Sequence, residues 1–359
     1  MKKLLLWLIV MLVGISMVAT FSLAGCKAEE AAPEEEVAEE AAPEEEVAEE
    51  AAPEEEVVPA EELPLEGLVI GYLPGSLQDA ARVVWSDNLE TAVREAGCEE
   101  FIIIDSAQDV TKQVNDGEDI LQMGIDILVM NPNDADAMIP VVKKANDMGI
   151  PVVCIDRATN GGEVVSTVGG DNWQIGEEAA ELLVELLDGK GKVLHIQGVL
   201  GASVVYERGE SFRRVMENYP DMVIVGEPSS DHWTTEDGLA FTEDALSAHP
   251  DLDAIYTHTD SITLGAFNAV EAAGKTDQII LCSQGWYGEI PNIMKEGSGT
   301  IYDWAFNCKA IGQATGDVVI KIAQGKLDII PKIVSVPCKV VTPDNVEEMW
   351  DEYNLNLFE

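Results

Sequence analysis

Polar side chains stand directly after several short apolar runs that have the composition of buried β-strands. Asp156 and Arg157, at the end of the run that begins at Val152, are the clearest example. A carboxylate beside a guanidinium fork with five N–H donors can hold hydroxyl groups through directed hydrogen bonds. The pair could instead be a structural ion pair that ends the strand, and the sequence leaves both alternatives open. The other polar residues in such positions are Asn131, Thr259, Asp260 and Gln284.

The elements that must position these side chains follow a regular order. Short β-branched runs alternate with amphipathic helical patterns, first over residues 68–156 and again over residues 174–282. Near-continuous apolar strands are typical of parallel sheets covered by helices on both faces. Two such series predict an α/β fold of two doubly wound parallel-sheet lobes, in which ligands bind beyond the carboxyl ends of the strands. The predicted strands are 68–73, 101–105, 127–130, 152–156, 193–196, 222–226, 254–257 and 279–282, and the predicted helices are 83–96, 110–123, 135–147, 174–187, 208–218, 235–248 and 262–273.

The N-terminus has the pattern of an export signal. Two lysines precede an apolar run from Leu4 to Ala19, which is short for a permanent membrane span. The run ends near Leu23-Ala24-Gly25-Cys26, which resembles the lipobox of bacterial lipoproteins, where the cysteine thiol is acylated and the chain is cut just before it. We therefore predict a lipoprotein signal peptide over residues 1–25 and a lipid on Cys26. An ordinary secretion signal with an incidental cysteine is the alternative, and both place the mature chain outside the cytoplasm.

An acidic repeat follows the cysteine. The ten-residue unit Glu-Glu-Ala-Ala-Pro-Glu-Glu-Glu-Val-Ala begins at Glu29 and again at Glu39, and a third copy from Glu49 ends in valine. The repeat has no aromatic residue with which to bury a face, and a proline in each copy interrupts helix. The 18 glutamates of residues 26–66 also repel one another. We predict that residues 26–66 form a disordered tether between the lipid and a folded domain, with binding of a partner by the repeat as the alternative.

The rest of the chain, residues 67–359, is strongly acidic. It holds 49 of the 67 acidic residues and 18 of the 21 basic ones, which gives a net charge of about −31. Such a surface repels phosphate backbones and argues against a nucleic-acid partner. The sequence has no Gly-x-Ser-x-Gly motif, no Walker loop and no cysteine or histidine spacing of a metal site. We therefore predict no catalytic residue, no metal and no cofactor.

Short motifs follow one another in a specific order along both lobes. They are Asn131-Pro-Asn-Asp-Ala-Asp136, Ile150 to Arg157, Gly162-Glu-Val-Val165, Gly170-Asp-Asn172, Gln197-Gly198, Glu207 to Phe212, Ala248-His-Pro-Asp251 and Leu264-Gly-Ala266. This ordered combination, over residues 65–342, resembles the type I periplasmic binding proteins, in particular the branch similar to ribose-binding protein. The resemblance implies two lobes joined by three crossing strands, with a ligand in the cleft between them. The lobes implied are residues 65–170 with 304–336, and residues 171–303 with 337–359.

The resemblance also implies which residues contact the ligand. Asp156 and Arg157 match the family's pair that binds sugar hydroxyls, and Arg208 matches its ligand-binding arginine. Trp233 aligns with the aromatic residue that stacks on the sugar from the second lobe. The alternative for Arg208 is a salt bridge on a helix surface. Matches to polar positions near the cleft, which could instead only cap helices, are Asn131 and Asn172.

Other positions depart from the family's pattern. Relatives place Asn-Pro-Phe-Phe after the first strand, whereas this chain has Asp79-Ala-Ala-Arg82, so the first lobe gains a cation and loses its stacking aromatics unless Trp85 substitutes. The family's Asn-Asp pair is Thr259-Asp260, and its Phe-Asp-Gly is Ser283-Gln284-Gly285. A glutamine near the third crossing is replaced by Asp303. We count Arg82, Asp260, Gln284 and Asp303 among the predicted ligand contacts. The changes predict a sugar or polyol of a different shape from ribose. The positive charge of Arg82 is also compatible with an anionic group on the ligand.

Together these features predict an extracytoplasmic solute-binding protein, held at the membrane by lipidated Cys26, in the periplasm or at the cell surface. It should capture a sugar or polyol and deliver it to the permease of an ABC importer, as a monomer and without enzymatic activity. The alternative is a sensory receptor that presents bound ligand to a membrane kinase or chemoreceptor. Transcriptional regulators that share the fold begin with a DNA-binding helix-turn-helix, and this chain has the signal and tether in that place.

Overall fold

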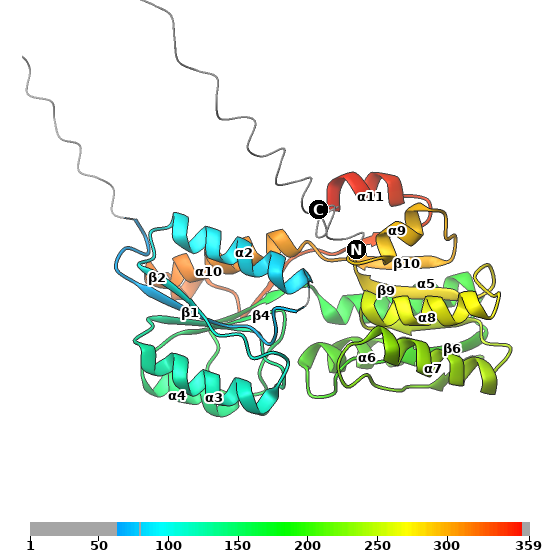
Figure 1. Cartoon of the computed structure of the whole chain (residues 1–359), viewed down its shortest axis with the longest axis horizontal. Coiled ribbons are helices and arrows are strands. Elements are labelled where there is room, and N and C mark those ends of the chain that lie inside the picture. Colours follow the sequence, from blue (N-terminus) through cyan, green and yellow to red (C-terminus); the bar gives the residue numbers. More distant parts are fainter. Residues whose placement is uncertain (1–62, 79, 354–359) are drawn as a thin grey trace, which may run out of the picture. The chain divides into compact units, whose positions relative to one another are not determined.

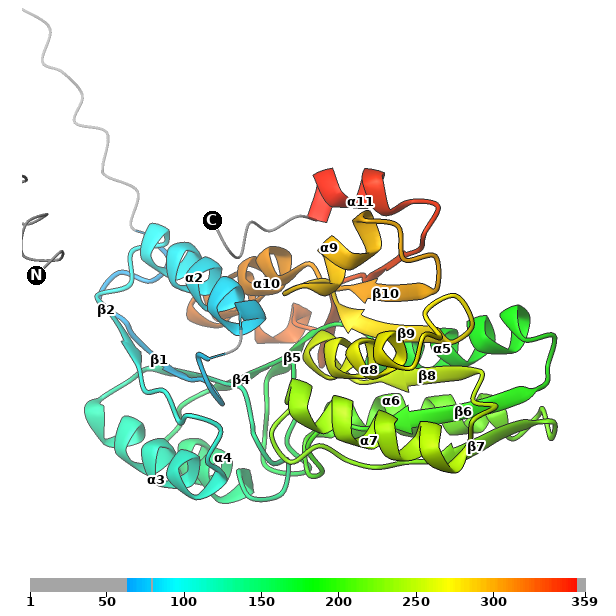
Figure 2. The same cartoon turned by 45° about the vertical axis from the view of Figure 1, so that its right-hand side comes forward.

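The computed structural model describes residues 63–78 and 80–353. The predicted signal peptide, Cys26 and nearly all of the predicted tether lie outside the described residues, and so does Asp79. Among the residues described, no helix is both long enough and apolar enough to cross a membrane. From residue 63 onward the chain forms two α/β lobes, each built on a six-stranded sheet (Figures 1 and 2).

The first lobe is built on a sheet in which every neighbouring pair of strands is parallel. Its strands are β1 (Val69–Leu73), β2 (Glu100–Ile103), β3 (Ile127–Met130), β4 (Val152–Ile155), β5 (Ser166–Gly169) and β11 (Ile333–Ser335), in the order β11-β5-β4-β3-β1-β2. Its helices are α2 (Ala80–Glu95), α3 (Val110–Ile120), α4 (Ile139–Asp147) and α10 (Cys308–Ala323), with short 3-10 turns at Leu121–Met123 and Leu327–Ile329.

Helices cover both faces of this sheet, and the strands supply apolar side chains to each. In β3, Ile127 and Val129 pack with α2 and α10, whereas Leu128 and Met130 pack with α3 and α4. All four side chains are buried. Burial on both faces is the reason for the near-continuous apolar runs in the sequence.

The second lobe repeats this plan with one exception. Its strands are β6 (Gly191–Ile196), β7 (Met222–Gly226), β8 (Ala254–Thr257), β9 (Ile280–Gly285), β10 (Ile301–Ala305) and β12 (Lys339–Val341), in the order β12-β10-β9-β8-β6-β7. Its helices are α5 (Asn172–Leu186), α6 (Ser203–Met216), α7 (Thr235–Ala248), α8 (Asp260–Ala272), α9 (Ile290–Lys295) and α11 (Val346–Tyr353). The exception is the edge strand β12, which runs antiparallel to β10 and which the sequence did not predict.

Three segments of the chain pass between the lobes. Residues 170–171 join β5 to α5, residues 306–307 join β10 to α10, and residues 336–338 join β11 to β12. The predicted fold class, two doubly wound lobes joined by three crossings, is confirmed. The second crossing follows Ala305, because β10 stays in the sheet of the second lobe to that residue, whereas the sequence placed the boundary after residue 303.

Direct hydrogen bonds also join the lobes beside α6. The amide of Ala158 donates to Ser203 Oγ at 2.9 Å, and the amide of Ala135 donates to the carbonyl of Gly201 at 2.9 Å. Ala135 and Ala158 belong to the first lobe, and Gly201 and Ser203 to the second. The lobes are therefore in direct contact beside α6.

Candidate functional site

The site lies where strands of both sheets end. In each sheet the strand order reverses beside the first strand, between β1 and β3 and between β6 and β8, and ligands of such sheets bind at this point. A pocket with a cavity volume of about 50 Å³ lies between the lobes. Its lining residues are Ala81, Arg82, Trp85, Asp156, Arg157, Val204, Arg208, Trp233, His258, Thr259, Gln284, Tyr287 and Phe306.

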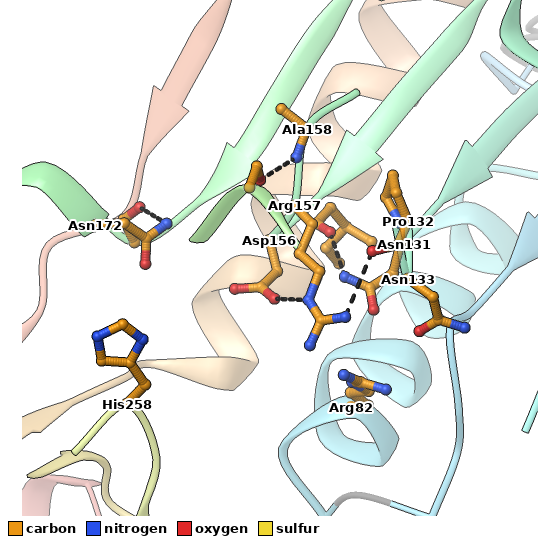
Figure 3. A network of polar contacts seen from close by, with 12 residues as sticks. Arg82, Asn131, Pro132, Asn133, Asp156, Arg157, Ala158, Asn172 and His258 are labelled. Carbon is orange, nitrogen blue, oxygen red and sulfur yellow. Dashed lines mark hydrogen bonds and ion pairs between the residues drawn. The ribbon is translucent and has the colours of Figure 1, made fainter. Parts of the chain in front are cut away.

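Asp156 and Arg157 reach the pocket directly after β4. Asp156 has a φ of 63°, in the left-handed region that is uncommon for residues other than glycine, and it turns the chain sharply at the strand end. Arg157 is almost fully buried, its Nε lies 3.6 Å from Asp156 Oδ2, and its Nη1 donates to the carbonyl of Pro132 at 3.4 Å (Figure 3). The ion pair is therefore present and its guanidinium lines the pocket, whereas contact of the pair with a ligand stays a prediction.

Arg208 enters from the second lobe on α6. Only 4% of the residue is exposed, so it does not form the surface salt bridge that the sequence left open. Its Nε donates to Asn172 Oδ1 at 2.8 Å and its Nη1 to the carbonyl of His258 at 3.1 Å. Its guanidinium carbon lies 5.6 Å from the ring centre of Phe306. Asn172 therefore holds Arg208 in place, whereas Asp171 caps α5 by accepting from the amide of Gln174.

Trp233 lies in a loop of the second lobe and touches the first. Its backbone has a φ of 61°, and its amide donates to Ser230 Oγ at 2.7 Å. The guanidinium carbon of Arg157 lies 5.2 Å from the ring centre, within cation–π range. A Cβ atom at Gly198 would stand 1.9 Å from Trp233 Cζ3, so the ring occupies space that only glycine leaves open.

The first lobe supplies Arg82 and Trp85 from α2. Arg82 is 4% exposed and donates through Nη1 to Gln108 Oε1 at 2.8 Å. Trp85 donates through Nε1 to the hydroxyl of Tyr72 at 3.1 Å. Burial raises the pKa of Tyr72 to about 12, so this hydroxyl stays neutral. An aromatic ring, Trp85, thus lines the part of the pocket where the sequence suggested that stacking aromatics were lost.

Three pocket residues carry a buried polar atom that has no hydrogen-bond partner among the described residues. They are the donor Trp233 Nε1 and the atoms His258 Nδ1 and Gln284 Oε1. Gln284 Nε2 already donates to the carbonyl of His258, which leaves Oε1 as an acceptor. A buried polar group without a partner costs about 1–3 kcal/mol. Three of them on one pocket wall favour a ligand with several hydrogen-bonding groups.

Two buried carboxyl groups, Asp260 and Asp303, lie next to the pocket without lining it. Asp260 accepts from the amide of Tyr287 at 2.8 Å and from the hydroxyl of Ser283. Burial and the neighbouring charge of Asp260 raise the pKa of Asp303 well above its usual value, and burial also raises the pKa of Asp260. We assign the proton to Asp303 and the negative charge to Asp260, which has the donors to stabilise it.

The structure brings six of the ten predicted ligand-binding residues to the pocket: Arg82, Asp156, Arg157, Arg208, Trp233 and Gln284. Asn172 supports Arg208, and Asn131 donates to the carbonyl of Ile155 at 2.8 Å behind the pocket (Figure 3). Asp260 and Asp303 face each other beside it. Contact of any of the ten with a ligand stays a prediction.

His258 and Phe306 also line the pocket and were not among the ligand-binding residues predicted from the sequence. Each follows a strand directly, β8 for His258 and β10 for Phe306. The position that identified Asp156 would therefore have identified His258 as well. Phe306 could not be predicted in this way because β10 was not among the predicted strands. In the described part of the chain, no group of histidine, cysteine and acidic side chains could hold a metal ion.

The chain was compared with known proteins. A family model described as "Periplasmic binding protein domain" matches residues 70–327. The ribose import binding protein RbsB of Bacillus subtilis (strain 168) is 33% identical over 274 residues, which are 76% of this chain and 87% of that protein.

Solved structures agree with this match. An ABC transporter solute-binding protein from Bacillus halodurans C-125, with bound myo-inositol, has a TM-score of 0.73 and 26% identity and covers 80% of this chain and 99% of its own. Another from Mycobacterium smegmatis, with bound glycerol, has a TM-score of 0.72 and 28% identity and covers 79% and 96%. The chain belongs to the periplasmic binding protein family, as its sequence motifs predicted. The members of this family are extracytoplasmic solute-binding proteins and not enzymes.

Proposed function

We propose that this chain captures a sugar or polyol between its two lobes and delivers it to the permease of an ABC importer. The observation that carries the proposal is the pocket wall, where buried arginines stand beside aromatic rings and unpaired polar atoms. Arg157 and Arg208 offer directed N–H donors for hydroxyl groups, and the rings of Trp233 and Phe306 suit the C–H faces of a sugar. The relatives support this ligand class, since one is named for ribose and two hold myo-inositol and glycerol.

Import is favoured over sensing by the same relatives, whose names refer to import or to ABC transporters. The alternative, a receptor that presents ligand to a membrane kinase or chemoreceptor, has no observation of its own in this chain. Membership in a family of solute-binding proteins supports a binding role without catalysis. A bound ligand should therefore be recovered chemically unchanged after the protein is denatured.

A screen by thermal unfolding tests the ligand class. D-ribose, myo-inositol, glycerol and the anionic sugar D-glucuronate are added separately to the full-length protein. A ligand present at 100 times its Kd stabilises the folded state by about 2.7 kcal/mol, which raises the unfolding temperature. We expect at least one of the neutral compounds to do so and calorimetry to give one site per chain. If none of the four stabilises the protein, the proposed function is wrong.

The N-terminal region completes the proposal. Residues 1–25 are assigned as a lipoprotein signal peptide and residues 26–66 as a tether whose Cys26 carries the lipid, and the mature protein as a monomer. The support is the sequence pattern Leu23-Ala24-Gly25-Cys26. Cys26→Ser should release the protein from membranes into the soluble fraction. Unchanged membrane association after fractionation would refute the lipid anchor.

A further inference from the structure

His258 stands at the reversal point of the second sheet, directly after β8. Its backbone carbonyl accepts from Arg208 Nη1 and from Gln284 Nε2, two side chains that also line the pocket. Its ring is fully buried, and in Figure 3 it lies on the opposite side of Asp156 from Arg82. The position of His258 is therefore fixed by its neighbours from two other elements, α6 and β9.

A chain of hydrogen bonds connects this ring to the surface. His258 Nε2 lies 2.9 Å from His195 Nε2, and His195 Nδ1 lies 2.8 Å from Glu227 Oε1. Glu227 also accepts from Arg213 Nη1 at 2.8 Å, and 34% of its side chain is exposed. His195 is fully buried, with the rings of Phe212 and Tyr256 packed against it. The chain thus runs from a partly exposed carboxylate to the pocket.

The protonation of the two rings follows from this order. The hydrogen bond from His195, with that from Arg213, lowers the pKa of Glu227 to about 2, so it is an ionised carboxylate that can only accept. Burial lowers the pKa of His195, and burial with the nearby cations lowers the pKa of His258 further, so both rings are neutral at pH 7. His195 must then carry its proton on Nδ1, which leaves its Nε2 as an acceptor. His258 must donate to it through Nε2–H.

The remaining nitrogen, His258 Nδ1, is consequently an unprotonated acceptor. It is buried and has no partner among the described residues, although its residue lines the pocket. We propose that His258 is a specificity-determining residue that accepts a hydrogen bond from a ligand hydroxyl through Nδ1, and that Glu227 and His195 act as positioning residues that hold it in this tautomer. The inference rests on the proposed function, because it assigns one contact of the sugar or polyol in the same pocket.

This assignment restricts the ligand. The group that faces His258 has to donate a proton, so it is a hydroxyl or an amine. A carboxylate, phosphate or carbonyl oxygen at this position would bring two acceptors together. If the ligand carries an acidic group, that group lies elsewhere in the pocket.

The test uses the full-length protein with D-ribose, myo-inositol and glycerol as probes, measured by calorimetry. His258→Phe keeps a flat ring and removes the acceptor, and should weaken the binding of the probe that binds best by about tenfold or more. His258→Asn, whose side-chain oxygen can replace Nδ1, should recover part of the loss. His249→Phe, a histidine at the end of α7, is the matched control and should change nothing. A monodeoxy analogue of that probe, without the hydroxyl that faces His258, should bind weakly to the parent. His258→Phe should bind this analogue and the intact probe with equal affinity.

Glu227→Gln tests the positioning role. An amide can donate as well as accept, so it no longer fixes the tautomer of either histidine. Nitrogen-15 NMR of the imidazoles should show His195 with its proton on Nδ1 and His258 with its proton on Nε2 in the parent, and a mixture in the variant. The matched control is Glu210→Gln, because Glu210 also pairs with an arginine and is also 34% exposed, and its recorded partner in the described part of the chain is Arg214.

The outcomes separate the two proposals. If the parent binds a probe and His258→Phe binds it within threefold, the contact is refuted and the proposed function stands. A parent spectrum with the proton of His258 on Nδ1 also refutes it. If the parent binds none of the four compounds of the thermal screen, the proposed function fails and the inference fails with it.

Discussion

Arg157 and Arg208 approach the pocket from opposite lobes, and each is held by acceptors of the protein. Arg157 contacts Asp156 and Pro132, and Arg208 contacts Asn172 and the carbonyl of His258. Both are at most 4% exposed. Fixed guanidinium groups can bind hydroxyls without first losing conformational freedom, which is the advantage of a preorganised site.

We predict that Arg157→Ala or Arg208→Ala weakens ligand binding by about 30- to 1,000-fold, or about 2–4 kcal/mol, because each removes a buried charged donor. Calorimetry with the best ligand from the screen measures the effect. Arg94→Ala is the control, since Arg94 pairs with Glu90 on the exposed surface of α2. Affinities of the two pocket variants within threefold of the parent would place the site elsewhere.

Gly198 controls the position of Trp233. Since a Cβ at residue 198 would overlap the indole ring at 1.9 Å, Gly198→Ala must displace the ring or the loop that carries it. We expect about a tenfold or greater loss of affinity in calorimetry, with the unfolding temperature changed much less than the affinity. Gly299→Ala is the control, because a Cβ there meets no atom within 4 Å. Unchanged affinity in Gly198→Ala would show that the position of Trp233 does not matter for binding.

At the scale of single residues, the sequence predicted which strand ends carry the site but not where each side chain points. Asp156 and Gln284 were found because each stands at a strand end, and both line the pocket. Asp260 has the same kind of position, yet its carboxylate turns to the amide of Tyr287 and away from the pocket. Asp303 is directed to Asp260, which depends on the packing of β10 beside β9. Such directions follow from tertiary packing, which a single sequence does not encode in its periodicity.

At the scale of elements, buried strands were predicted better than helix starts. The strands at residues 127–130 and 254–257 agree with β3 and β8, because their apolar runs are bounded by polar residues on both sides. Helix α6 begins at Ser203, five residues before the predicted start at Arg208. Its N-cap, Ala202, makes no side-chain hydrogen bond, so the sequence contains no cap signal there.

Asp303 of β10 interacts with Asp260 at the start of α8, and this pairing predicts a dependence of stability on pH. In the unfolded chain an aspartate has a pKa of about 4. In the folded chain burial and Asp260 hold the pKa of Asp303 well above that value. Between the two pKa values the folded state binds more protons than the unfolded state, so the free energy of unfolding falls as the pH rises through this range.

Asp303→Asn keeps a neutral side chain at every pH, so the free energy of unfolding should no longer fall through this group as the pH rises. We expect the variant to need more denaturant than the parent for unfolding at pH 7, and the difference to shrink near pH 4. Asp260→Asn is the matched comparison and should be less stable than the parent at pH 7, since its amide oxygen cannot replace both acceptors used by Tyr287 and Ser283. A destabilised Asp303→Asn protein at pH 7 would mean that Asp303 is charged in the fold.

At the scale of the two lobes, direct contacts join the lobes beside the pocket. Ala158 and Ala135 donate to Ser203 and Gly201, and Arg157 lies over Trp233. Three short crossings also connect the lobes. A few crossing residues can absorb a hinge rotation, and a ligand that touches both lobes then binds the closed form better than the open one.

We therefore predict that ligand binding makes the protein more compact. Small-angle scattering on residues 60–359 should give a smaller radius of gyration when the best ligand of the screen is added at saturation. Ser203→Ala removes the acceptor of the Ala158 amide and should weaken closure, so that more ligand is needed for the same change. Thr91→Ala is a suitable control, because the hydroxyl of Thr91 donates to the carbonyl of Asp87 within α2 at the surface. A tight ligand that leaves the scattering of the parent unchanged would indicate a receptor that is closed before it binds. The ligand would then have to reach the unpaired polar atoms of the pocket without a hinge motion of the lobes.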